Sequence, residues 1–180
     1  MKSGFFVAVS LALALSVQCR GQNPKQPANL RSILLHELRT THNQADWFVP
    51  INVAIEGVTA EQANWQPPRG GHSVGQLAYH LLFWDRRNLA KLKGESNAKF
   101  DGNNDETFEK FENKRWSETA HELDEVMTDL EKLVESVDEP KLASIAPTIA
   151  NICTHNAYHT GQIVYVRKLQ GSWNPEKGVK

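Results

Sequence analysis

Apolar residues recur at intervals of three and four along most of this chain, and no segment alternates convincingly as a β-strand would. Near the start of this pattern the apolar residues are Leu30, Ile33, Leu34 and Leu38. Their spacing places them on one face of an α-helix. The pattern therefore predicts a first helix from Leu30 to about Trp47, with Pro50 as a residue that ends or kinks it.

Three further amphipathic stretches predict three further helices. The second begins after Ser73, a suitable N-cap, and runs to about Lys93, where Gly94 follows. The third runs from near Ser117 to about Val137. The fourth runs from roughly residue 148 to 170, and a glycine again follows it.

The segments between these helices are predicted to be connectors. Residues 61–71 contain two prolines and two glycines. Residues 95–114 are polar and form a long excursion, which three aromatic side chains are expected to hold against the fold: Phe100, Phe108 and Phe111. A shorter linker is predicted between Pro140 and Pro147. Four helices with one long connection predict an all-α, four-helix bundle over residues 29–172, with residues 173–180 as a C-terminal tail.

The N-terminus has the pattern of a secretory signal peptide over residues 1–20. Lys2 precedes an apolar run from Phe5 to Leu15, which is too short to span a bilayer comfortably. An uncleaved N-terminal anchor is the alternative. Residues 21–28, with two prolines, are expected to form a flexible tether. The protein is thus predicted to be exported to the periplasm or the exterior, without a stable membrane span after processing.

Composition narrows the classes of partner. The net formal charge is −1 and there is no basic block, which argues against a nucleic-acid partner. Cys19 could carry the lipid of a lipoprotein, but Gln18 stands where a small residue is expected, so this is the less favoured reading. Only Cys153 is certain to remain in the mature chain, so no internal disulfide is expected.

Three histidines are the strongest candidates for chemistry. His155 and His159 are four residues apart in the predicted fourth helix, which stacks them on one face, and His80 lies in the second helix. All three fall on the shoulders of apolar stripes, where side chains line a cleft between helices. Three imidazoles bound to one divalent ion would leave a position open, as in catalytic zinc sites. Several first-row divalent ions suit such ligands.

Other motifs are less suited to a metal site. Asn156 stands where a zincin would need glutamate, so the HExxH motif of metalloproteases is absent. Glu118 and His121 match one Glu-x-x-His element, but di-iron bundles need two. Cys153 points away from His155 and is expected in the core. The remaining histidines of the early chain are expected to be surface or structural residues: His36, His42 and His72.

Three further residues lie close to the histidines in the sequence. Asp85 lies about 140° around the helix from His80, so it is a weak general-base candidate and is expected to face solvent. Tyr158 and Gln162 are candidates to touch the site. No catalytic acid or base is identified.

The chain resembles the DinB-like superfamily. The segments that carry the resemblance are Asn64-Trp65-Gln66-Pro67, Ser73 to Asp85 around His80, and His155-x-x-x-His159-Thr160-Gly161-Gln162. The resemblance implies a four-helix bundle with His80, His155 and His159 as its metal triad. It also implies a divalent ion of zinc, nickel or iron, and often a dimer. For some members it implies thiol transfer or isomerisation with a thiol cofactor. The export signal departs from this pattern because such thiols are cytoplasmic.

Three hypotheses for function follow from these patterns. The first is an exported metal-dependent hydrolase or transferase that acts on a small-molecule substrate. The second is a non-catalytic bundle that binds a metal or a small ligand at the cell envelope. The third is a structural module that contacts partners through its tryptophans, although aromatic residues at helical spacing are usually core residues.

Overall fold

The structure is a computed structural model that describes residues 28–96, 99–109 and 111–178. The predicted signal peptide, residues 1–20, and residues 21–27 of the predicted tether lie outside the described residues.

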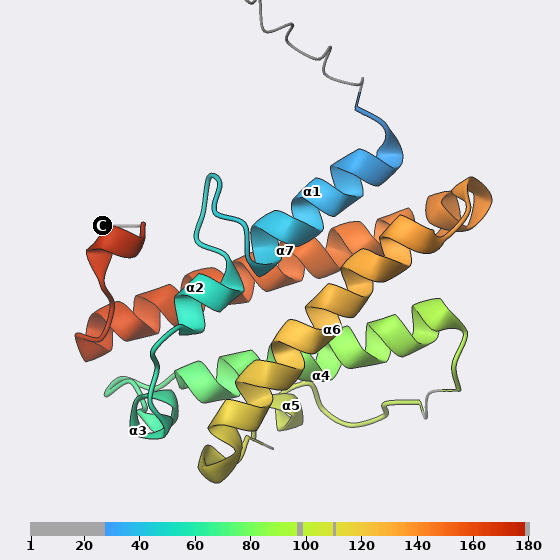
Figure 1. The fold of residues 1–180 in the computed structure, drawn as a ribbon. Helices are drawn as coiled ribbons and strands as arrows, with labels where there is room; N and C mark the ends of the chain where they lie inside the picture. The colour runs from blue at the N-terminus through green and yellow to red at the C-terminus, as the bar shows by residue number, and fades with distance from the viewer. Residues whose placement is uncertain (1–27, 97–98, 110, 179–180) are drawn as a thin grey trace, which may run out of the picture.

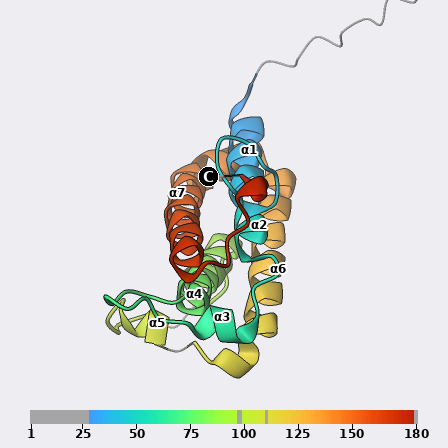
Figure 2. The same ribbon diagram turned by 90° about the vertical axis from the view of Figure 1, so that its left-hand side faces the viewer.

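Four long helices form the body of the protein (Figure 1). They are α1 (Leu30–His42), α4 (Val74–Lys93), α6 (Trp116–Ser136) and α7 (Glu139–Gln170). Both α1 and α4 pack against α6 and against α7, so the four helices surround a common core (Figure 2). The described residues contain no strand, which confirms the all-α prediction.

The core is built from the apolar stripes of these helices. Its fully buried side chains include Leu38 of α1, Leu77 and Leu81 of α4, Met127 of α6 and Ile149 of α7. Burying each such side chain contributes about 2 kcal/mol to stability. The contact of α4 with α7 matters most for function, because it brings the predicted histidine positions together.

Short helices connect the long ones. They are α2 (Ile51–Ile55), α3 (Ala60–Asn64), α5 (Glu106–Glu109) and two 3₁₀ turns, η1 (Asn113–Arg115) and η2 (Pro175–Lys177). Helix α2 packs on α7, whereas α3 and α5 pack on α4. As predicted, Phe108 in the long excursion is buried, and Phe111 packs against the core. Phe100 makes edge-to-face contacts with Phe83 and Trp84.

The first helix is shorter than predicted. It ends at His42, and the backbone N–H groups of Asn43 and Gln44 both donate to the carbonyl of Arg39, which closes the last turn. The apolar stripe of α1 stops at Leu38, and Trp47, which suggested a continuation, is 95% exposed. Pro50 does not end α1 but caps the start of α2.

The predicted connector at residues 61–71 was wrong in its first part, because α3 covers residues 60–64. Thr59 caps this helix: its hydroxyl accepts from the backbone of Gln62, and the Gln62 side chain accepts from the backbone of Thr59. This reciprocal pair is a capping box, which the sequence Thr-x-x-Gln contains. Ser73 and Gln76 form the same device at the predicted start of α4.

The predicted linker between Pro140 and Pro147 was also wrong, because both prolines lie in α7. Pro140 is in the first turn, where its missing N–H needs no partner. Pro147 lies inside the helix, where it removes one backbone hydrogen bond. The helix continues past Pro147 because apolar side chains on both sides of it are buried, namely Leu142, Ile145 and Ile149.

Replacing Pro147 by alanine is expected to stabilise the protein by about 1–3 kcal/mol, because alanine restores the backbone N–H and removes the steric clash of an interior proline. Residue 147 is exposed, so no core contact is lost. Urea unfolding of the parent and the Pro147→Ala variant would measure the difference. A less stable variant would mean that the packing of α7 depends on the proline.

The C-terminal segment packs on the bundle. The Arg167 guanidinium lies 5.3 Å from the ring centre of Trp173, and Lys177 pairs with Glu56 at 2.5 Å. Among the helices in the described ranges, none combines the length and apolar character that crossing a membrane requires.

Candidate metal site

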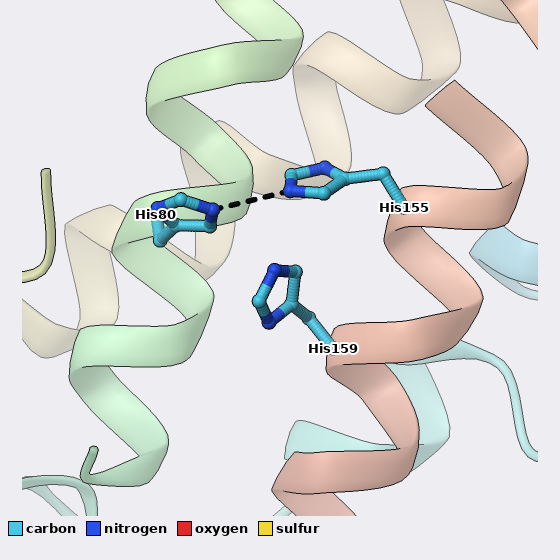
Figure 3. Close-up of side chains that lie close together, drawn as sticks. All are labelled: His80, His155 and His159. Carbon is cyan, nitrogen blue, oxygen red and sulfur yellow. Dashed lines mark hydrogen bonds between the residues drawn. The ribbon is translucent and has the colours of Figure 1, made fainter. Parts of the chain in front are cut away.

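The three predicted histidines converge between α4 and α7. His80 projects from α4 and His155 and His159 project from α7 into one space (Figure 3). One ligand atom from each lies within 4.8 Å of the others, and the Nε2 atoms of His80 and His155 are 3.1 Å apart. Two nitrogens on one zinc ion, each at about 2.0–2.1 Å from it, lie at most about 4 Å apart. The predicted convergence is confirmed, and the spacing is close to what one ion requires.

A threonine orients His80. The Nδ1 atom of His80 is 2.5 Å from the hydroxyl of Thr107 in α5, and that hydroxyl donates its only hydrogen to the carbonyl of Asn104 at 2.6 Å. Thr107 can therefore only accept, so His80 Nδ1 is the donor. His80 Nε2 then has a lone pair directed into the site, as a metal ligand needs.

A glutamine orients His159 in the same way. Its Nδ1 donates to the side-chain oxygen of Gln162 at 2.6 Å, which leaves Nε2 free to bind a metal. The amide nitrogen of Gln162 donates in turn to the hydroxyl of Tyr158 at 3.3 Å. Both residues therefore adjoin the histidines, as the sequence suggested.

His155 carries its hydrogen on Nε2, whereas His80 and His159 carry theirs on Nδ1. Because His80 Nε2 has no hydrogen, the contact between the two Nε2 atoms requires His155 Nε2 to be the donor in the metal-free chain. For both nitrogens to become ligands, the hydrogen on His155 must move to Nδ1. Once that hydrogen has moved, the lone pairs of the two Nε2 atoms would face each other, and a cation between them would be stabilised by both.

Burial keeps the histidines neutral. It is the main reason that the pKa of His80 falls to about 3 and that of His155 to about 4, and the neighbouring imidazoles lower both further. Burial also lowers the pKa of His159. At neutral pH all three rings are therefore uncharged, which is the form that binds metals.

An aromatic stack supports this arrangement. The ring of Phe108 lies between two imidazoles, 3.8 Å from the ring centre of His72 and 3.9 Å from that of His80, and nearly parallel to both. His72 was expected to be a surface or structural residue, and this contact makes it structural. Thr107 and Asn104 could not be identified from the sequence, because the polar segment that contains them has no periodic pattern.

A pocket of about 710 Å³ opens beside the histidines and includes all three in its lining. Trp84, Asn104 and Tyr158 are also in the lining. None of the described lining residues is an aspartate or glutamate. The pocket can therefore admit a small molecule to a bound metal, but it offers no carboxylate as a general base.

Asp85 was expected to face solvent, and this prediction was wrong. Its side chain is 0% exposed and accepts a hydrogen bond from Asn156 of α7 at 2.9 Å. Burial raises its pKa to about 7, against the opposing effect of that hydrogen bond. Asp85 is not in the lining of the pocket, so it does not face a substrate there.

The remaining candidates are structural. His42 is buried between Glu131, at 2.6 Å from Nδ1, and Asp124, at 2.8 Å from Nε2. His36 pairs with Asp46 at the surface. Cys153 is buried in the core, as predicted, and burial raises the pKa of its thiol to about 12.

The Glu-x-x-His element of α6 does not form a metal site with other described residues. Glu118 pairs with Arg115 at 2.7 Å, and His121 pairs with Glu125 at 3.4 Å on an exposed face. The only group of at least three potential metal ligands within the described ranges is the histidine triad.

Comparison with known proteins gives one match. The family model for the DinB superfamily matches residues 51–163, which is more than half of the chain and includes all three histidines. No curated protein and no solved structure matches the chain significantly.

Proposed function

Because this chain belongs to the DinB superfamily, we propose that it is an exported protein that binds one divalent metal ion through His80, His155 and His159 and uses it as a hydrolase or transferase. The observation that carries the proposal is the convergence of three neutral imidazoles beside an open pocket. Three protein ligands leave at least one coordination position for water or substrate.

The donor set fits several metals. Imidazole nitrogens suit zinc, nickel and iron alike, so the proposal includes all three. A bound divalent ion would supply Lewis acidity, which polarises a substrate oxygen or activates a water for attack. The residues of the chain would supply the rest: Thr107 and Gln162 hold His80 and His159 in the tautomers that present Nε2.

The absence of a carboxylate from the described pocket lining supports a second candidate function. A bundle that only sequesters a metal or a small ligand needs no general base, and the described lining offers no Asp or Glu. Hydrolysis or transfer of ester, amide and thiol-adduct substrates that depends on the triad would favour the enzyme. Metal binding without any such activity would favour the binding protein.

Export is part of the proposal because of the pattern of residues 1–20. Export argues against a cytoplasmic thiol as co-substrate and favours a substrate that is present outside the inner membrane. Fractionation of cells that produce the full chain tests this: recovery of a shortened protein outside the cytoplasm supports export, and a full-length cytoplasmic protein contradicts it.

Elemental analysis of the purified protein tests the metal site. We expect about one divalent ion per chain, because the described residues contain one such site. The double variant His155→Ala/His159→Ala is expected to lose the metal, since it keeps only one of the three ligands. His36→Ala/His121→Ala is a matched control, because both of these histidines are exposed and lie outside the triad. Equal metal content in both double variants would refute the proposed site.

A further inference from the structure

The pocket beside the triad is elongated along two helices. On α4 its lining residues are His80, Trp84, Asn88 and Lys91, which are spaced by four, four and three positions and so lie on one face. On α7 the lining runs from His159 back to Thr148. At about 1.5 Å per residue, Lys91 lies about 16 Å along α4 from His80.

The far end of this groove is positively charged. Lys91 is exposed and forms no ion pair with any residue that the structure describes. It also lines a second pocket of about 520 Å³, which shares Trp84 and Asn88 with the first. The lining of that pocket adds the cations Arg87 and Lys99 and one acidic residue, Glu95, so cations outnumber acids at this end. The Cα–Cβ bond of a helical residue leans toward the helix N-terminus, so at Lys91 it leans along α4 in the direction of His80.

The middle of the groove combines one aromatic side chain with polar groups. Trp84 forms part of the wall, and its indole N–H donates to the side chain of Asn104 at 3.2 Å, which fixes the ring. Asn88 and Asn151 add amide groups that can donate to and accept from a ligand. A chain-like or planar molecule can lie over Trp84 between the triad and Lys91.

From this arrangement we propose that the substrate is an elongated small anion. Its reactive group would lie at the histidine triad and its carboxylate or phosphate would pair with Lys91, assisted by Lys99. This inference rests on the proposed metal site. A cation in the last turn of α4 interacts favourably with the helix dipole whether or not a ligand binds. The presence of Lys91 alone would therefore not indicate a ligand. Lys91, however, lies at the end of a groove that starts at the triad, and the described lining of the pocket beside the triad contains no acidic residue.

The test uses the full chain loaded with cobalt(II), whose visible absorption reports ligands at the metal. The probes are hydroxamates, which chelate the metal, with a tail of increasing length that ends in a carboxylate, a phosphonate or a neutral methyl group. Suberic acid monohydroxamate and its longer homologues supply the carboxylate series. We expect an anionic tail of sufficient length to bind about fivefold more tightly than the neutral tail, and high salt to remove the difference.

Variants of Lys91 test whether this residue causes the preference for an anionic tail. Lys91→Ala is expected to abolish the preference for an anionic tail, and Lys91→Glu to reverse it, so that the neutral tail binds more tightly. Lys132→Ala removes an exposed lysine of α6 outside the groove and should leave the preference unchanged. Whether the carboxylate or the phosphonate gains more from Lys91 identifies the anion.

Two negative results can be told apart. Hydroxamates that bind the cobalt-loaded protein with no gain from an anionic tail at any length, or with a gain that survives in Lys91→Ala, would overturn the inference and leave the metal site intact. A protein that takes up no cobalt would overturn the metal site, and the substrate inference with it.

Discussion

Zinc at about a thousand times its dissociation constant is expected to raise the free energy of unfolding of the metal-free protein by about 4 kcal/mol. The reason is that His80 comes from α4 whereas His155 and His159 come from α7, so unfolding separates the ligands. An ion bound only by the folded chain stabilises that state through its binding free energy. Urea unfolding at increasing zinc concentrations would measure the gain.

His80→Ala is expected to lose most of this stabilisation, because His155 and His159 alone are one turn apart on α7 and cannot connect it to α4. His121→Ala is the control, since this histidine is exposed on α6, pairs with Glu125 and lies outside the triad. Zinc that stabilised His80→Ala as much as the parent would show that the ion does not bridge the two helices.

The pH dependence of these effects follows from the low pKa values. In the unfolded chain the histidines titrate near about 6.5. In the folded chain burial holds the pKa of His80 at about 3 and that of His155 at about 4. The metal-free protein should therefore lose stability as the pH falls from about 6.5 toward about 4, because the unfolded state takes up protons first.

Zinc affinity of the folded protein should change little over the upper part of that range, because protons compete for these imidazoles only near their folded pKa values. Titration with a competing chelator at several pH values would measure it. A steep loss of affinity that begins near about pH 6.5 would mean that the imidazoles are not shielded from solvent as the structure describes.

The positions of the histidines were predictable because each lies beside an apolar stripe that has to be buried. His80 adjoins Leu77 and Leu81, and the contact of α4 with α7 then sets it opposite His155 and His159. Thr107 was not predictable in this way. It reaches His80 from α5, a short helix in a polar segment whose path depends on the packing of Phe108 against the finished bundle.

The helix boundaries show the same contrast. Ser73 and Gly94 bound α4 as predicted because capping depends on residues next to each other in the chain. Pro147 was misread because proline disfavours a helix locally, but the burial of Ile145 and Ile149 on either side outweighs that preference. The prediction that Asp85 faces solvent was wrong because it assumed that only one face of its helix is buried. Helix α4 packs against α5, α6 and α7, so more than one face is covered.

Asp85→Asn is expected to stabilise the protein by up to about 4 kcal/mol at about pH 8. The folded pKa of Asp85 is about 7, against a normal value of 3.8, because burial disfavours its charged form. Its contribution to stability is therefore fully present below about pH 3.8 and is lost as the pH rises toward about 7, where the unfolded chain has released a proton that the folded chain still holds. Asparagine has no such proton to lose.

The neighbouring atoms favour asparagine as well. Asp85 Oδ1 and Asn156 Oδ1 are both buried without a hydrogen-bond partner, although the two side chains already share one hydrogen bond. Two acceptors cannot satisfy each other, but the amide of an asparagine at position 85 can donate to Asn156 and still accept from it. In the parent, a protonated Asp85 could likewise donate a hydrogen bond to Asn156.

Urea unfolding of the parent and Asp85→Asn between about pH 4 and about pH 8 would test this account. The two proteins should be nearly equal at the acidic end, where Asp85 is protonated when folded, and should diverge as the pH rises. Zinc affinity should be unchanged, because Asp85 is outside the pocket lining and contacts Asn156 rather than a histidine. A variant that is less stable at every pH would instead mean that the Asp85 carboxyl group has a partner that asparagine cannot replace.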